Sequence, residues 1–372
     1  MDPLSHLRTA LDELESAGLR RRTPAPHAGI SYCSNDYLGL AARRLGETSA
    51  PVGSGASRLI AGEDAAHGEL ERALATWLGV EATLLFTSGY AANVGIMSAL
   101  AGAGDLVVSD ALNHASLIDG ARLSRARVAV TAHNDLAAVS AALAIRAEKH
   151  AWVVVESYYS MDADGPDLRA LRSVCDAHGA ALVVDEAHAL GVLGPAGLGR
   201  CAEAEVTADV LVGTLGKSFG GQGAFAAGSL VLREWLWNRA RSFVFSTGLA
   251  PVLAEAALQS LGTMEMHPEL RAQTLSRASQ LRAGLAEAAR GTELRVMGFG
   301  HVVPLLVGST SEAIRLARLV QEEGVAIPAI RPPTVPDGTA RLRFTVTARH
   351  AAADIDLAIR ATERAIQRWR SP

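Results

Sequence analysis

The sequence predicts an α/β protein: a large domain with a mostly parallel, seven-stranded-type sheet flanked by helices, and a smaller C-terminal α/β domain. Two observations predict this fold. Between residues 82 and 216, six short apolar runs alternate with helical stretches, as in a parallel sheet covered on both faces. Beyond about residue 250 the pattern changes to long helices rich in Ala, Leu and Arg. A chain of 372 residues is long enough to bury two cores.

The N-terminal segment, residues 1–47, is expected to be a helix followed by extended chain. MDPLSHLRTALDELESAGLRRR reads as an amphipathic helix that carries both charge signs and ends near Thr23-Pro24. It lacks the apolar core and cleavage site of a signal peptide. SYCSNDYLGL then predicts a short extended piece and a turn, and we expect it to pack with the C-terminal domain.

The large domain is predicted over residues 48–254. After the loop PVGSGASRLIAG, the stretch EDAAHGELERALATWLGV has helical spacing and ends at Gly79. The strands that follow are expected at ATLLFTS, DLVVSD, VAVTA, AWVVVES, AALVVDEA and DVLVGTLG. In the small domain, residues 255–372, strands are expected at HVVPLLVGS, VAIPAI and RLRFTVTA.

Composition limits the possible functions. The net charge of −4 gives no excess of positive charge for binding a nucleic-acid backbone. No apolar run approaches the roughly 20 residues of a membrane span, so we expect a soluble protein, and the N-terminus without signal-peptide features predicts a cytoplasmic one. Three scattered cysteines are too few for a disulfide framework or a closed zinc site, and we expect no metal. Of 35 basic residues only Lys149 and Lys217 are lysines, and Lys217 lies in an apolar, glycine-rich segment.

Polar residues follow several of the predicted strands, where ligands bind in open α/β sheets. Asp185 and His188 follow one strand, and Glu156 ends another. Thr214 and Lys217 follow a third strand, and the small-residue turn Ser88-Gly89-Tyr90 leads into a helix whose free N–H groups can hold a phosphate. The ordinary alternatives are helix caps for Ser88 and Asp185 and a buried structural histidine for His188.

One hypothesis for these residues is a nucleotide-hydrolysing helicase, because DEAH and GKS imitate helicase signatures. A phosphate-binding P-loop needs a glycine six residues before its lysine, and that position is Leu211. GKS also follows the acidic segment, whereas a helicase has the opposite order. The pattern and the negative net charge both argue against this hypothesis.

The second hypothesis is a pyridoxal-phosphate enzyme. This cofactor needs a lysine for a Schiff base, an acid that keeps its ring nitrogen protonated, and anchors for its phosphate. Lys217 would be the lysine and Asp185 the acid. Ser88-Gly89-Tyr90 and Thr214 would be the phosphate anchors.

A series of ordered motifs along nearly the whole chain resembles the α-oxoamine synthases of pyridoxal-phosphate fold type I. The motifs are SNDYLGL, GSGASRLIAG, HGELE, FTSGYAAN, NHASLIDG, ESYYSMDADG, DEAHALGVLGPAGLGR, GTLGKSFGGQGAF, FSTGLAP and AIRPPTVPDGTARLRFTVTA. The resemblance rests on some ten segments rather than on one glycine pattern. It supports pyridoxal 5'-phosphate as the cofactor and a homodimer as the assembly.

The resemblance also implies roles for single residues around the cofactor. His114 matches the histidine that stacks on the ring and contacts substrate, and Ser160 and His188 match groups that contact the ring and its phenolic oxygen. Ser246 and Thr247 resemble residues that reach the phosphate of the neighbouring subunit.

On the substrate side, Arg343 matches the arginine that grips the amino-acid carboxylate, a task suited to a two-pronged donor. Arg20, Asn35 and Thr334 match further substrate positions, and a solvated charge run is the alternative for Arg20.

The stretch IRPPTVPDGTARLR most closely resembles the members that condense L-alanine with a pimeloyl thioester in biotin biosynthesis. It leaves open whether coenzyme A or an acyl carrier protein delivers the pimeloyl group. The alternatives are the members that join glycine to a short acyl thioester, 2-amino-3-ketobutyrate ligase and 5-aminolevulinate synthase. A cofactor-free binding protein is a further alternative, disfavoured by the intact set of Lys217, Asp185 and His188.

Overall fold

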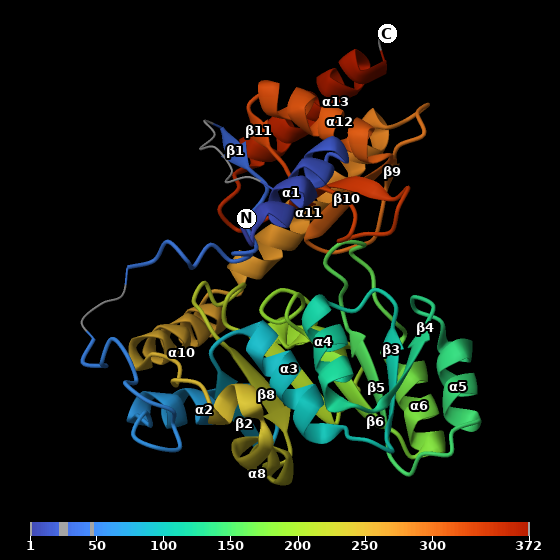
Figure 1. Cartoon of the computed structure of the whole chain (residues 1–372). Coiled ribbons are helices and arrows are strands. Elements are labelled where there is room, and N and C mark those ends of the chain that lie inside the picture. Colours follow the sequence, from blue (N-terminus) through green and yellow to red (C-terminus); the bar gives the residue numbers. More distant parts are fainter. Residues whose placement is uncertain (1, 22–28, 45–47, 371–372) are drawn as a thin grey trace.

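The computed structural model describes residues 2–21, 29–44 and 48–370. Figure 1 shows a large sheet with helices on both sides in the lower part of the molecule, and a smaller sheet with long helices above it. In the described part of the chain, no helix combines the length and the apolar character needed to cross a membrane.

The large sheet has seven strands in the order β2-β8-β7-β6-β5-β3-β4. β8 is antiparallel to both of its neighbours, and the other neighbouring pairs are parallel. This confirms the predicted mostly parallel sheet. The strands are β2 (Ala82–Phe86), β3 (Leu106–Asp110), β4 (Arg127–Thr131), β5 (Ala151–Glu156), β6 (Ala181–Asp185), β7 (Val210–Thr214) and β8 (Ala224–Gly228).

Side chains of the central strands alternate between two apolar layers. Val107, Val154 and Val183 pack into one cluster, while their neighbours Val108 and Val153 pack into the other. Such strands, buried on both faces, need helices on both sides. One face is covered by α3 (Gly89–Leu100), α4 (Ala115–Ser124), α8 (Leu230–Arg239) and α9 (Arg241–Val244), and the other by α2 (Ala65–Leu78), α5 (Leu136–Ala144), α6 (Leu168–His178) and α10 (Pro251–Met266).

β8 is not among the predicted strands, because its residues AFAAG are mostly small and lack the β-branched character of the other strands. β8 lies between β2 and β7 and is buried along most of its length. A short 3-10 turn, Pro195–Gly197, and the short helix α7 (Gly199–Glu203) connect β6 to β7.

The smaller sheet is antiparallel, with the strand order β12-β13-β10-β9. The predicted strand VAIPAI is interrupted at Pro328, so that its two halves join different sheets. β11 pairs with β1 near the N-terminus, which confirms that this segment packs with the C-terminal part. The elements are β1 (Ile30–Ser31), β9 (Arg295–Val296), β10 (Val302–Gly308), β11 (Val325–Ala326), β12 (Ala329–Ile330), β13 (Ala340–Thr345), α11 (Glu269–Ala288), α12 (Thr310–Glu322) and α13 (Ala352–Arg370).

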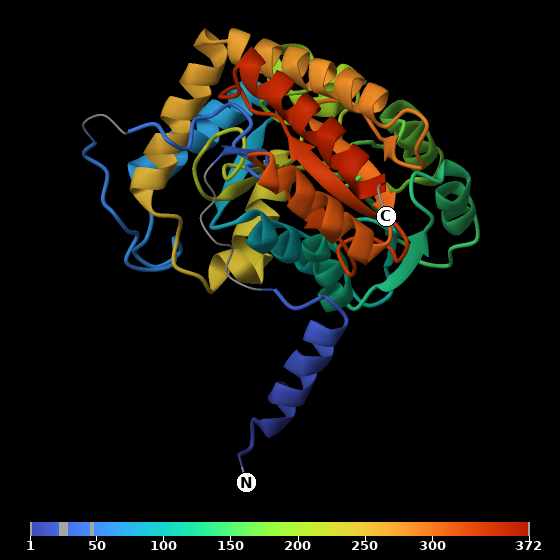
Figure 2. The same cartoon turned by 90° about the horizontal axis from the view of Figure 1, so that it is seen from above.

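The first helix differs from the prediction. α1 spans Ser5–Ser16, whereas the sequence reading continued it to about Thr23-Pro24, residues that lie outside the described part of the chain. Gly18, with a φ of +66°, follows directly and favours an end at this point. None of the residues of α1 is buried, and Figure 2 shows the helix projecting from the body.

The boundary between the two apolar cores lies between the helices α10 and α11. Core residues of α10, such as Ala254 and Leu261, belong to the cluster under the large sheet. Ala278 and Leu281 of α11 belong to the cluster of the small sheet. The domain limits at residues 48, 254 and 255 stay a prediction.

Candidate functional site

The candidate site lies at the carboxyl edge of the large sheet, where β5, β6 and β7 end side by side. Glu156 at the end of β5 is directly opposite Asp185 at the end of β6. Thr214 ends β7, and Lys217 follows in the next turn. Parallel strands bring their carboxyl ends to one edge, so the polar residues after each apolar run gather here as the sequence predicts.

Asp185 is held rigidly at this edge. Its Oδ2 accepts a hydrogen bond from Asn93 Nδ2 at 2.8 Å, and its Oδ1 accepts one from the backbone N–H of Ala187 at 2.8 Å. Asn93 also donates to Ser116 Oγ at 2.9 Å, while its buried Oδ1 has no hydrogen-bond partner among the described residues. Asp185 is therefore a fixed carboxylate within a polar network.

Lys217 and Glu156 interact electrostatically with Asp185 at this edge. Burial lowers the pKa of Lys217 to about 8, against the opposite effect of the Asp185 and Glu156 carboxylates. Burial and the nearby Asp185 raise the pKa of Glu156 to about 8, and the charge of Lys217 opposes that rise. The amine of Lys217 is therefore available in its neutral form close to neutral pH.

His114 lies across from these groups at the start of α4. Its backbone N–H donates to Glu156 Oε1 at 2.7 Å, and its Nδ1 is 2.7 Å from Ser116 Oγ. Burial lowers the pKa of the imidazole, and the charge of Lys217 adds to this effect, while Asp185 opposes it. The ring is thus neutral near neutral pH.

His188 follows β6 and is 8% exposed. Its Nδ1 is 2.6 Å from the hydroxyl of Tyr37, a residue of the SNDYLGL motif. Burial holds the pKa of His188 well below its ordinary value, with further lowering by the charges of Lys217 and Arg343.

The predicted phosphate anchors also come together. Ser88 caps α3 by accepting a hydrogen bond from Ala91 N–H, and a Cβ placed on Gly89 would lie 3.8 Å from Thr214 Oγ1. Thr214 Oγ1 accepts the N–H of Gly216 at 3.2 Å. A helix start beside a hydroxyl and a glycine-rich turn fits an anionic group. Tyr90 is exposed, and its hydroxyl binds Asp119.

Arg343 reaches the site from β13 of the small sheet and is 4% exposed. Its Nε donates to the carbonyl oxygen of Ser160 at 2.6 Å. Both terminal nitrogens are 3.2 Å from Asn35 Oδ1. The structure therefore brings Asn35, Ser160 and Arg343 together, although they are far apart in the sequence.

Four predicted residues make no direct bond with this cluster. Within residues 2–21, 29–44 and 48–370, no hydrogen bond or ion pair joins Arg20, Thr334, Ser246 or Thr247 to Lys217, Asp185 or Arg343. Arg20 forms an ion pair with Glu15 at 3.5 Å. Its carbonyl accepts a 3.5 Å hydrogen bond from Arg331, in the same loop as Thr334. Thr334 and Thr247 are exposed, and Ser246 is half-buried.

Sequence reasoning gave no role to three residues that the structure places in the site: Asn93, Glu156 and Tyr37. A signal for Glu156 was present, because it ends its strand as Asp185 ends the next one. Asn93 and Tyr37 close the motifs FTSGYAAN and SNDY, but their contacts depend on three-dimensional packing.

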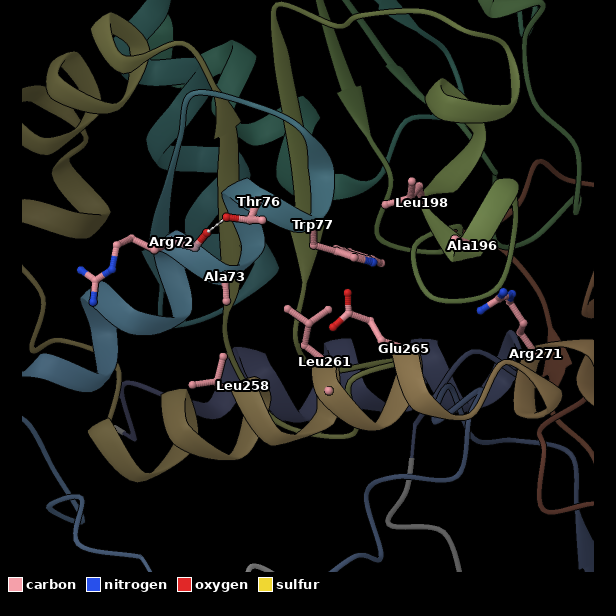
Figure 3. Close-up of a pocket in the computed structure, with 11 residues that line it drawn as sticks. Arg72, Ala73, Thr76, Trp77, Ala196, Leu198, Leu258, Leu261, Glu265 and Arg271 are labelled. Carbon is pink, nitrogen blue, oxygen red and sulfur yellow. Dashed lines mark hydrogen bonds between the residues drawn. The ribbon is translucent and has the colours of Figure 1, made fainter.

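A separate hollow lies between α2 and α10, away from the cluster just described. Figure 3 shows Trp77 and Glu265 near its centre, with Arg271 on one side and Arg72 on the other. None of the predicted site residues lines it.

A family model and several known proteins match this chain over most of its length. Residues 28–361 match the model of the family described as aminotransferase class I and II. An 8-amino-7-oxononanoate synthase of Paracidovorax citrulli is 44% identical, over 95% of this chain and 92% of that protein. An 8-amino-7-oxononanoate synthase of Marinobacter nauticus is 45% identical, over 89% of this chain and 86% of that protein.

Solved structures agree. The serine palmitoyltransferase of Sphingomonas wittichii is 28% identical, with a TM-score of 0.89 over 99% of each chain. A serine palmitoyltransferase variant of S. paucimobilis with a bound PLP–myriocin adduct is 26% identical, also with a TM-score of 0.89 over 99% of each chain. The chain therefore belongs to the aminotransferase class I and II family, and the two relatives described above are 8-amino-7-oxononanoate synthases.

Proposed function

We propose that this protein condenses L-alanine with a pimeloyl thioester and releases carbon dioxide and the carrier thiol, making 8-amino-7-oxononanoate for biotin biosynthesis. The observation that carries the proposal is the near full-length identity of 40–45% to synthases with this name. The cluster of Lys217, Asp185 and Arg343 supplies the groups that such a reaction needs.

The cofactor is pyridoxal 5'-phosphate, and the residues at the sheet edge fit it. Lys217 has a lowered pKa that suits an amine able to bond to an aldehyde. Asp185, fixed by Asn93 and Ala187, offers a carboxylate for a protonated ring nitrogen. The free N–H groups at the start of α3 offer donors for a phosphate, and Thr214 lies beside them, with its hydroxyl donating to the carbonyl of Gly223 at 3.2 Å. When bound, the cofactor withdraws electrons from the α-carbon of the amino acid.

Four residues of the chain have separate roles in the proposed reaction. Arg343 uses Nε for Ser160 and one N–H of each terminal nitrogen for Asn35, and it grips the carboxylate of L-alanine with the two N–H groups that remain. Lys217, neutral above a pKa of about 8, takes the α-proton at Nζ and later returns a proton. His114 is assigned to the contact with the cofactor ring, where burial lowers its pKa and keeps the imidazole uncharged. Asn35 positions Arg343 through its Oδ1.

The remaining roles belong to the same proposal. Ser160, His188 and Tyr90 lie on the cofactor side, and Arg20 and Thr334 on the substrate side. Ser246 and Thr247 serve the neighbouring subunit of a cytoplasmic homodimer, a role supported by the exposure of Thr247 in the single chain. Either coenzyme A or an acyl carrier protein would deliver the pimeloyl group.

Thiol release from pimeloyl-coenzyme A by the cofactor-loaded protein tests the proposal. L-Alanine should support release and glycine much less. Lys217→Ala should abolish both the release and the visible absorbance of the lysine-bound cofactor. Lys149→Ala is a matched control, because Lys149 is the other lysine of the chain and is exposed. It should alter neither the thiol release nor the absorbance.

The outcomes separate the alternatives. If glycine with a short acyl thioester turns over far better than L-alanine with pimeloyl-coenzyme A, the substrate assignment is wrong. If no pair of substrates turns over and no absorbance depends on Lys217, the assignment of Lys217 as the cofactor lysine is wrong as well.

A further inference from the structure

A chain of hydrogen-bonded polar side chains connects Arg343 to His188, and all of its members except the half-buried Asn35 are buried. Both terminal nitrogens of Arg343 donate to Asn35 Oδ1 at 3.2 Å. The hydroxyl of Tyr37 lies 3.3 Å from the same Oδ1 and 2.6 Å from Nδ1 of His188. Tyr37 is 0% exposed, so water does not compete for its hydroxyl.

The hydroxyl of Tyr37 carries a single hydrogen, which it donates to one of two acceptors. Burial raises the pKa of Tyr37 to about 12, so the hydroxyl keeps this hydrogen near neutral pH. Asn35 Oδ1 already accepts two N–H groups, which matches its two lone pairs. His188 Nδ1 is also much the closer acceptor, at 2.6 Å against 3.3 Å.

His188 carries one ring hydrogen, because burial and the charges of Lys217 and Arg343 keep the imidazole neutral. The other ionisable groups that influence it are His301 and His114. His301 packs edge-on against the Tyr37 ring, with centroids 4.1 Å apart, but its ring nitrogens make no hydrogen bond within the described chain. It therefore fixes the ring of Tyr37 without taking its hydrogen.

We propose that Tyr37 is a positioning residue that donates to Nδ1 of His188 and so keeps the histidine hydrogen on Nε2. His188 then presents an N–H donor, rather than a bare nitrogen, to the group bound beside Lys217. Asn35 supports this arrangement, because Arg343 occupies its carbonyl oxygen and leaves the Tyr37 hydrogen for His188. The inference deepens the proposed function and rests on it for the identity of the bound group.

The test compares Tyr37→Phe with Tyr158→Phe. Tyr158 is a matched control, because it is also buried, also contacts the His301 ring and donates its hydroxyl to the carbonyl of Phe299 instead of a site residue. Full-length protein labelled with ¹⁵N-histidine gives the protonation of each His188 nitrogen by long-range ¹H–¹⁵N spectra, with His188→Gln as the assignment standard. The visible absorbance of the cofactor-loaded protein is titrated with pH in parallel.

In the wild type, Nδ1 should be unprotonated and hydrogen-bonded, and Nε2 protonated. Tyr37→Phe should shift the Nδ1 resonance and raise the midpoint of the absorbance titration by at least about 0.5 pH unit, roughly a threefold change in proton affinity. Tyr158→Phe should leave both unchanged. Asn35→Ala, which does not alter the buried ring of Tyr37, should leave the His188 nitrogens as in the wild type.

A protonated Nδ1 in the wild type would overturn the inference, because Tyr37 would then be the acceptor. So would a shift of the His188 signals in Asn35→Ala, since the hydroxyl would then have donated to Asn35. If the wild type binds cofactor but fails to use L-alanine, the proposed function is wrong and the ¹⁵N spectra still decide the inference.

Discussion

Replacing Arg343 by lysine tests the proposed grip on the amino-acid carboxylate. The guanidinium is almost fully buried, with Nε bonded to Ser160 and both terminal nitrogens directed at Asn35. Lysine preserves the positive charge, but its ammonium has three N–H donors against the five of arginine. It therefore cannot bond to Ser160 and Asn35 and also offer two donors to a carboxylate.

The size of the effect follows from the bonds that are lost. A hydrogen bond to a charged group contributes about 1.5–3 kcal/mol, and about 1.4 kcal/mol corresponds to a tenfold change in affinity. Losing one of the two prongs on the carboxylate should therefore raise the KM for L-alanine by about 10- to 100-fold. Because the carboxylate is held throughout binding, kcat should fall by a smaller factor.

Steady-state rates with varied L-alanine and saturating pimeloyl thioester measure this change. Arg341→Lys is the matched control: Arg341 lies two residues away on β13, is 2% exposed and forms a 2.6 Å ion pair with Asp162. It should lower the melting temperature but leave the KM for L-alanine close to that of the wild type. A KM within about threefold of the wild type for Arg343→Lys, or an equal rise in both variants, would refute the reasoning.

Two further predictions concern pH. Glu156, whose own pKa is raised to about 8, becomes charged only as the pH approaches 8, and this charge raises the pKa of Lys217. Glu156→Gln removes it, so the pKa of Lys217 should fall slightly below about 8 and the acid limb of the kcat profile should move to lower pH; a limb that moves to higher pH would contradict the assignment. Although burial lowers the pKa of His133, its hydrogen bonds with Asp110 and Asp164 raise it to about 10. This raised pKa stabilises the fold below the ordinary histidine pKa of about 6.5, and the stabilisation is lost as pH rises through about 10. Urea unfolding should thus find His133→Gln less stable than the wild type at pH 6, with a smaller difference above pH 10; an equal difference at both would argue against the charged pair.

The parallel sheet and the polar residues at its edge could both be predicted from the same short segments of sequence. Runs such as AWVVVE and ALVVD are apolar on two faces, which fits strands covered by helices on both sides, and each ends in an acid at the carboxyl edge of the sheet. Lys217, one of the two lysines of the chain, follows the next run and completes the pattern. These signals are local in the sequence.

The rest of the site depends on contacts between distant segments. Arg343 is an ordinary strand residue in the sequence, and only the resemblance to a family gave it a role before the structure placed it beside Asn35 and Ser160. Asn93 lies within a helix, and nothing local shows that its amide reaches Asp185. β8 was missed because small residues carry little strand signal when a neighbouring strand decides their pairing.

The position of β8 has a consequence for how the chain folds during synthesis. β2 is an edge strand whose sheet partner is β8, and these strands are separated by more than a hundred residues of sequence. Until β8 leaves the ribosome, the apolar side chains of Leu84, Leu85 and Phe86 have no strand beside them. Long-range pairing of this kind is slow and exposes nascent chains to aggregation. A chain truncated before residue 224 should therefore accumulate with chaperones or in inclusion bodies, even though most of its parallel strands are present.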